Sequence, residues 1–110
     1  MLSTHVLDLY RGVPAENVTV TFYRDGEKIA TLQTNADGRI HDLAAQGYTI
    51  TSGTYEMHFD IGRYFEQQGV QMDSPFLDVA PIRFLLDDRA KHYHVPLLVS
   101  PWGYQMYRGS

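Results

Sequence analysis

The alternation of apolar and polar residues along the chain predicts a series of short β-strands. In residues 18–23, for instance, apolar side chains alternate with hydroxylated ones, which is typical of a strand with one buried face. Residues 79–86 show a similar alternation, which turns Ile82, Phe84 and Leu86 inward. The predicted strands before the C-terminal segment cover residues 2–9, 18–23, 28–33, 55–60 and 79–86.

Residues 92–110 are predicted to form a hairpin, with arms at residues 92–100 and 104–107 joined by a turn at residues 101–103. The period of two along a strand divides the first arm into two faces. One face carries Tyr93, Val95, Leu97 and Val99, and the other carries His92, His94, Pro96, Leu98 and Ser100.

Pro96 bears on the surroundings of this hairpin. A proline cannot donate a hydrogen bond to a β-ladder, so its amide side is expected to face a sheet edge, a bulge or another subunit. Apolar Pro96 and Leu98 beside His94 would form an exposed patch in a monomer. We therefore expect a symmetry-related copy of the chain to cover this patch.

Turn and helix signals complete the predicted architecture. Asp25 and Gly26 are typical of a two-residue hairpin turn, and residues 35–38 form a second tight turn that places Arg39 at the start of the next segment. Residues 40–52 are expected to form a loop or a short irregular edge strand. Asp60 caps one short helix that ends at Gly69 in a left-handed conformation. A loop through residues 73–75 and a turn at residues 87–88 connect the remaining strands. Together, the predicted strands, the turns and the single helix indicate an all-β sandwich with one short helix.

Length, composition and charge limit the possible functions. With 110 residues, 44% of them hydrophobic, the chain is predicted to form a single domain over residues 1–110. A net charge of −4 with nine scattered basic residues argues against a nucleic-acid surface and favours a small-molecule partner. No cysteine is present, which excludes thiolate chemistry. The sequence shows neither an apolar run of about 20 residues nor a secretory segment, so we expect no membrane association and a cytoplasmic location.

Five residues could carry chemistry: His5, Arg39, His94, Tyr107 and Ser110. Imidazole can act as a general base near neutral pH, and a planar guanidinium can bind two acceptors and stabilise a developing oxyanion. Each residue type also has an ordinary structural role in a strand, a turn or a terminal segment. The residue chemistry alone therefore leaves the function open.

A metal site is an alternative explanation for two of the histidines. The spacing of His92 and His94 would suit two zinc ligands, but zinc needs a third and a fourth. His41 and His58 are available, yet nothing in the spacing brings them to the pair. We therefore expect a site without metal or cofactor.

Three segments together resemble a known family. Residues 92–110 closely resemble the C-terminal signature of the transthyretin-related hydrolases that act on 5-hydroxyisourate, whose chains end in Tyr-Arg-Gly-Ser. Residues 2–8 with residues 12–15 resemble the family's first signature, and residues 34–39 resemble its second. The resemblance spans the full length, with the signatures in the same order.

The resemblance implies a transthyretin-like (prealbumin-like) β-sandwich that hydrolyses 5-hydroxyisourate to 2-oxo-4-hydroxy-4-carboxy-5-ureidoimidazoline in urate degradation, without a cofactor. Which histidine is the base stays open. The catalytic residues that it implies are His5, Arg39, His94 and Ser110. The implied substrate-binding residues are His5, Arg39, Tyr107, Arg108 and Gly109.

The resemblance also implies a homotetramer, a dimer of dimers whose sites lie in a channel between subunit pairs. The face that carries His94, Pro96 and Leu98 would line this channel. One alternative is a transthyretin-like carrier that binds an aromatic small molecule in the same channel. A carrier would need no histidine and arginine converging on the pocket. A third alternative is an adhesion or sugar-binding sandwich, in which the three signatures would be coincidental.

Overall fold

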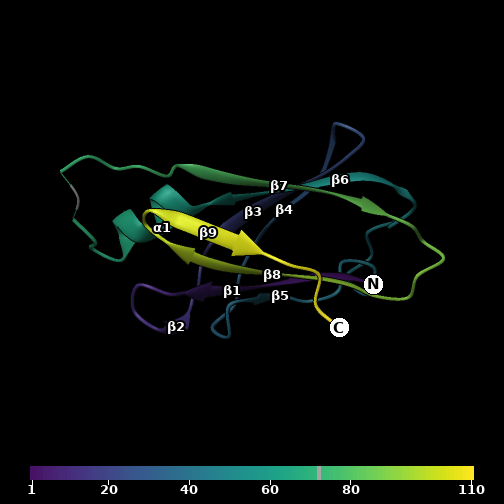
Figure 1. Cartoon of the computed structure of the whole chain (residues 1–110). Coiled ribbons are helices and arrows are strands. Elements are labelled where there is room, and N and C mark those ends of the chain that lie inside the picture. Colours follow the sequence, from purple (N-terminus) through teal and green to yellow (C-terminus); the bar gives the residue numbers. More distant parts are fainter. Residues whose placement is uncertain (72) are drawn as a thin grey trace.

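Two β-sheets stack as layers in the computed structural model, which describes residues 1–71 and 73–110 (Figure 1). Sheet A contains β1 (Leu2–Asp8), β2 (Val13–Pro14), β5 (Arg39–Ile40), β8 (Tyr93–Ser100) and β9 (Gly103–Met106). Sheet B contains β3 (Thr19–Arg24), β4 (Glu27–Gln33), β6 (Gly53–Asp60) and β7 (Val79–Leu86). A short helix, α1 (Ile61–Gln67), follows β6. The predicted all-β sandwich is confirmed.

The core lies between the inward faces of the two sheets. In β6, Tyr55, Met57 and Phe59 have no exposed surface, as their alternation with polar residues predicts. In β8, which belongs to the opposite sheet, Leu97 and Val99 are equally buried. Full burial of a large apolar side chain stabilises the fold by roughly 1.5–3 kcal/mol. The period of two therefore assigns the side chains of these strands to the correct faces.

Helix α1 has the predicted start and stop. The Asp60 carboxylate accepts a hydrogen bond from the backbone N–H of Arg63 at 3.4 Å, and Gly69 has a φ of +77° just beyond the helix. A helix of seven residues is too short to be stable alone. It packs closely on the chain before β7, because a Cβ on Gly62 would lie 2.7 Å from the carbonyl oxygen of Leu77.

Two turns form as predicted. Asp25 and Gly26 both have positive φ, 49° and 83°, which is the geometry of the two-residue turn that joins β3 to β4. Residues 35–38 turn the chain into the two-residue strand β5, and residues 41–52, for which a loop or a short edge strand was predicted, form no strand. The two-residue strand β2, paired with the end of β1, was not predicted.

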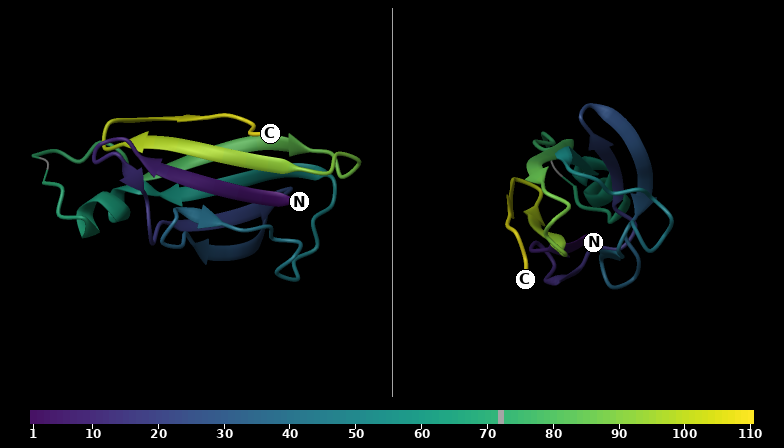
Figure 2. Two further views of the ribbon diagram at one scale, coloured as in Figure 1. Left: turned by 90° about the horizontal axis from the view of Figure 1, so that it is seen from below. Right: turned by 90° about the vertical axis from the view of Figure 1, so that its right-hand side faces the viewer.

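The parallel pairing of β1 with β8 joins the two ends of the sequence and was also not predicted. Its register runs from Leu2 opposite Tyr93 to Asp8 opposite Val99. On its other side β1 pairs antiparallel with β5, where His5 lies opposite Arg39. Figure 2 shows the chain's N- and C-termini at the same end of the molecule. Strands from both termini and from the middle of the sequence therefore meet in sheet A.

The expectations for Pro96 need correction in two respects. Its strand, β8, lies inside sheet A between β1 and β9 rather than at an edge. The carbonyl of Pro96 accepts a hydrogen bond from the N–H of Tyr107. The nitrogen of Pro96 therefore faces the same side, just past Met106, where β9 ends. The missing donor therefore falls where regular pairing stops. Pro96 is also buried within the chain, so it adds little to an exposed patch.

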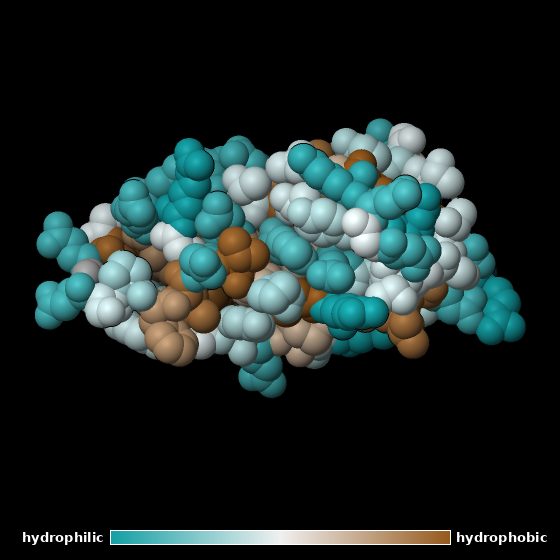
Figure 3. Space-filling model, turned by 90° about the horizontal axis from the view of Figure 1, so that it is seen from above, coloured by the Kyte–Doolittle hydropathy of each residue, from teal (hydrophilic) through white to brown (hydrophobic). Residues whose placement is uncertain are grey.

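One long face of the sandwich is largely polar. Figure 3 shows hydrophilic side chains over much of one long face, with smaller groups of apolar side chains between them. Among residues 1–71 and 73–110, no helix has the length and hydropathy needed to cross a bilayer.

Candidate active site

The turn before β5 fixes the position of Arg39. The side-chain oxygen of Asn35 accepts hydrogen bonds from the backbone N–H groups of Asp37, at 2.9 Å, and Arg39, at 3.0 Å. Gly38 has a φ of +75°, and a Cβ there would lie 2.5 Å from the carbonyl oxygen of Val6. Only glycine fits such a turn closely against β1. The turn therefore holds Arg39 at a defined place beside that strand.

A buried hydroxyl anchors the same turn from the other side. Thr34 donates a hydrogen bond to the carbonyl of Ala15 at 2.6 Å and accepts one from the N–H of Val18 at 2.9 Å. The three residues are buried. The second sequence signature thus includes residues that position the arginine as well as the arginine itself.

His5, Arg39 and His94 lie on the outer face of sheet A. Their strand neighbours Thr4, Ile40 and Val95 are buried toward the core, so the alternate positions point outward. His5 and Arg39 are directly opposite across β1 and β5. His94 lies across from Ser3, two residues from His5 on the same face of β1. The structure thus brings together three side chains that are far apart in the sequence.

The last residues of the chain run back along β8 next to His94. The N–H of Gly109 donates to the carbonyl of His94 at 2.7 Å, and the N–H of Tyr107 donates to that of Pro96 at 3.4 Å. A Cβ on Gly109 would lie 2.8 Å from Cδ2 of the His94 ring. Glycine at this position therefore allows the segment to lie directly against the imidazole.

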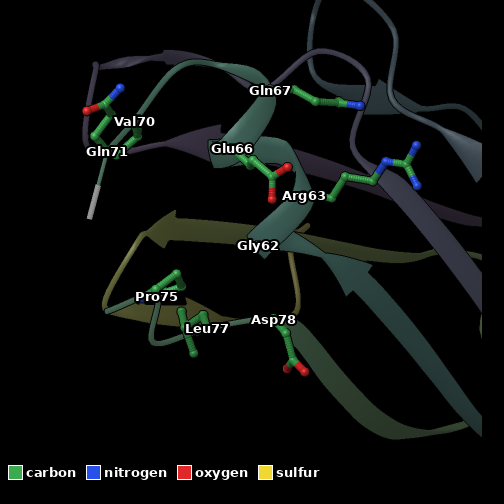
Figure 4. Close-up of a pocket in the computed structure, with 9 residues that line it drawn as sticks. All are labelled: Gly62, Arg63, Glu66, Gln67, Val70, Gln71, Pro75, Leu77 and Asp78. Carbon is green, nitrogen blue, oxygen red and sulfur yellow. The ribbon is translucent and has the colours of Figure 1, made fainter. Parts of the chain in front are cut away.

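An open hollow of about 530 Å³ lies where these elements meet. Arg39, His94 and Ser110 line it, together with Met1, Ser3, Thr4, Ile40, His41 and Asp42. His5 is not part of its lining. A larger hollow of about 770 Å³ lies between α1 and the segment before β7 (Figure 4), but it has no histidine among its lining residues. We assign the candidate site to the smaller hollow because it contains groups that can transfer protons.

Burial and positive charge lower the pKa of both histidines. The pKa of His5 lies below its ordinary value of 6.5, mainly because of burial and then because of the charge on Arg39, while interactions with Asp37 oppose the shift. The pKa of His94 is lowered by burial, by Arg39 and by His5, in that order. Both rings are therefore mostly neutral at pH 7, the state that can accept a proton.

Of the five predicted substrate-binding residues, only Arg39 lines the hollow; His5, Tyr107, Arg108 and Gly109 are not part of its lining. Arg108 stacks over the ring of Tyr93, with its guanidinium carbon 4.2 Å from the ring centre, and donates a hydrogen bond to the carbonyl of His92. Tyr107 lies opposite Pro96 on the outer face of sheet A and is 51% exposed. Within one chain, Arg108 fastens the terminal segment rather than lining the hollow.

The four histidines of the zinc alternative do not gather at one place, although His41 and His94 line the same hollow. His92 is exposed and precedes β8, while His58 pairs with Glu56 on sheet B at 2.8 Å. His41 borders the hollow, 3.3 Å from the side-chain nitrogen of Asn35. In the described part of the chain, no three His, Cys, Asp or Glu side chains gather as metal ligands would.

Ser3 is a site residue that the sequence analysis missed. Its hydroxyl lies 2.8 Å from Nδ1 of His94. A serine in a strand gives no signal of such a contact, because the contact depends on the register between β1 and β8. The only available clue was its position within the first family signature.

Comparisons with known proteins agree with this architecture. The sequence profile of the HIUase/Transthyretin family matches residues 2–109. The chain is 46% identical to 5-hydroxyisourate hydrolase 2 of Rhizobium meliloti, over 99% of this chain and 95% of that protein. It superposes on the structure of Klebsiella pneumoniae 5-hydroxyisourate hydrolase with a TM-score of 0.85 and 38% identity, covering 99% and 97% of the two chains. Transthyretin from Sparus aurata gives a TM-score of 0.84 and 33% identity, covering 98% and 95%. The chain therefore belongs to the HIUase/transthyretin family and has its transthyretin-like β-sandwich.

Proposed function

We propose that this chain hydrolyses 5-hydroxyisourate to 2-oxo-4-hydroxy-4-carboxy-5-ureidoimidazoline, as a step in urate degradation. The observation that carries the proposal is the meeting of His5, Arg39 and His94 on the outer face of sheet A, in a chain 46% identical to a 5-hydroxyisourate hydrolase. Neutral imidazoles beside a guanidinium supply a base and an oxyanion-stabilising group, which the hydrolysis of a ring amide needs.

The reaction uses water as the nucleophile. An imidazole nitrogen takes a proton from water while the water oxygen bonds to the ring carbonyl carbon, and negative charge develops on the carbonyl oxygen. The ring C–N bond then breaks, and the departing nitrogen receives the proton held by the imidazolium. Water and protein side chains supply every proton in this sequence.

Arg39 holds the substrate and stabilises the developing oxyanion. Its guanidinium presents several N–H donors in one plane, which suits a heterocycle that carries several carbonyl groups. The lowered pKa values of His5 and His94, to which Arg39 contributes, support a base that is neutral when substrate arrives.

The terminal segment forms one wall of the site. Ser110 lines the hollow beside Arg39 and His94, where its hydroxyl can bind substrate or relay a proton. Gly109 gives the segment its close approach to His94. We assign substrate contacts to Tyr107 and Arg108 in an assembled oligomer, since within one chain both lie away from the hollow.

The assembly proposed for this function is a homotetramer, a dimer of dimers. Leu98 supports it because it lies half-buried on the outer face of sheet A, in register with Leu7 on the neighbouring strand. Covering these apolar positions with a second copy would enclose the open hollow and exclude bulk water from it.

A carrier is the competing function, because the TM-score of 0.84 to a transthyretin is nearly that of 0.85 to the hydrolase, but the identity is lower, 33% against 38%. The test is the decay of ultraviolet absorbance from freshly generated 5-hydroxyisourate, with and without the protein. Decay that accelerates in proportion to protein concentration is the expected result. Unchanged decay, together with stoichiometric binding of an aromatic ligand, would establish the carrier instead.

A further inference from the structure

The imidazole of His94 is held at two of its edges by opposite ends of the chain. The hydroxyl of Ser3 lies 2.8 Å from Nδ1. On the other edge, the backbone of Gly109 packs so closely that a Cβ there would lie 2.8 Å from Cδ2. Among the described residues no hydrogen bond reaches Nε2. The ring is therefore fixed in orientation with Nε2 as its free nitrogen.

Ser3 is well placed for this contact. It lies opposite His94 in the parallel register of β1 and β8, and it is only 9% exposed. In the described part of the chain its hydroxyl has no other hydrogen-bond partner. The neighbouring hydroxyl of Thr4, by contrast, points to the core face and donates to the carbonyl of Val95 at 2.6 Å. The Ser3 hydroxyl thus serves His94 alone.

We propose that Ser3 is a positioning residue for His94, which it orients so that Nε2 faces the substrate and exchanges the proton during hydrolysis. The inference rests on the function proposed above, and in it Ser3 acts through His94 rather than on the substrate.

The chemistry of a hydroxyl suits this role because it can both accept and donate a hydrogen bond. In the resting enzyme, neutral His94 donates Nδ1–H to the Ser3 oxygen, which leaves a lone pair on Nε2. When Nε2 takes the proton of water, the ring becomes a cation and its bond to Ser3 strengthens. When Nε2 returns that proton to the departing nitrogen, the ring is again neutral and held in the same orientation.

The test compares three variants with the wild-type protein: Ser3→Ala, Ser3→Thr and, as the control, Ser100→Ala. Ser100 lies on the same outward face of β8 as His94 but outside the lining of the hollow. Two properties are measured: the titration and tautomer of His94 by ¹⁵N NMR without substrate, and kcat and KM against pH with 5-hydroxyisourate.

In Ser3→Ala we expect kcat to fall about tenfold with little change in KM, the size of effect that loss of one hydrogen bond produces. Loss of the hydrogen bond to Ser3 destabilises the protonated ring more than the neutral ring. The pKa of His94 and the acidic limb of the rate profile should therefore both move to lower pH. Ser3→Thr keeps a hydroxyl and should restore both properties, while Ser100→Ala should match the wild type.

A Ser3→Ala protein with an unchanged His94 titration and an unchanged rate profile would overturn the proposal. Equal losses in Ser3→Ala and Ser3→Thr would also overturn it, because the effect would then be one of packing. A wild-type protein that does not hydrolyse 5-hydroxyisourate would contradict the proposed function, and the NMR titration would still report on the contact between Ser3 and His94.

Discussion

At the scale of single residues, the protonation of His5 and His94 determines when the site can work. Burial and the charge of Arg39 lower both pKa values below 6.5. The base must be neutral, so kcat/KM should rise with pH through a midpoint below 6.5 and level off by about pH 7. Rates measured across this range check the prediction. A midpoint above 6.5 would show that neither histidine, in this environment, is the base.

Arg39 gives a second prediction at this scale. Arg39→Lys keeps the positive charge but loses the planar arrangement of donors, so turnover should fall by roughly 100-fold while the fold is retained. The matched control is Arg83→Lys, which changes an exposed arginine of β7 on the other sheet. Near wild-type turnover in Arg39→Lys would mean that a point charge is sufficient at this position.

At the scale of elements, the turn at residues 35–38 determines where Arg39 lies. Gly38→Ala would place a Cβ 2.5 Å from the carbonyl oxygen of Val6, at a φ of +75°. The variant should lose more than about 1 kcal/mol of stability and most of its turnover, because the turn must move away from β1. Gly12→Ala is a suitable control, since its φ is +73° but no atom lies within 4 Å of the added Cβ. Thermal melting and turnover of both variants separate the close approach from the strain of positive φ. Equal losses of melting temperature and turnover in the two variants would show that the strain of positive φ, and not the close approach to β1, causes the effect.

The strands also show what alternation can and cannot predict. It placed Tyr55, Met57 and Phe59 in the core and His94 outside, because a period of two determines the face of a strand. It does not determine the neighbouring strand, so the parallel pairing of β1 with β8 was missed. Strands of two residues, such as β2, are too short to show any period.

The same limits apply to the candidate site. The sequence signatures identified His5, Arg39 and His94, but only the registers in sheet A reveal that these residues lie together. The contact of Ser3 with His94 was not predicted for the same reason. The direction of the Arg108 side chain could have been predicted from alternation. If Tyr107 and Gly109 face outward, Arg108 between them faces the opposite way.

At the scale of the whole molecule, the outer face of sheet A is where we propose that subunits meet. Leu98→Glu would set negative charges against one another across this face, so tetramers should dissociate toward dimers and turnover should fall. Leu85→Glu is the control, because Leu85 is 76% exposed on β7 of the other sheet. Light scattering and turnover measure both effects. A wild-type monomer with full turnover would contradict a site that depends on assembly.

We propose above all that strands and segments from both ends of the chain join to form one hydrolytic site. The most direct test is to delete residues 107–110 and to measure turnover of 5-hydroxyisourate and thermal melting together. These residues are exposed or half-buried and follow the last strand, so they contribute little to the core. We predict that hydrolysis is abolished while the melting temperature stays within roughly 4–8 °C of the wild type, the shift that corresponds to about 1 kcal/mol. Full turnover in the shortened protein would show that the terminal segment is not part of the site.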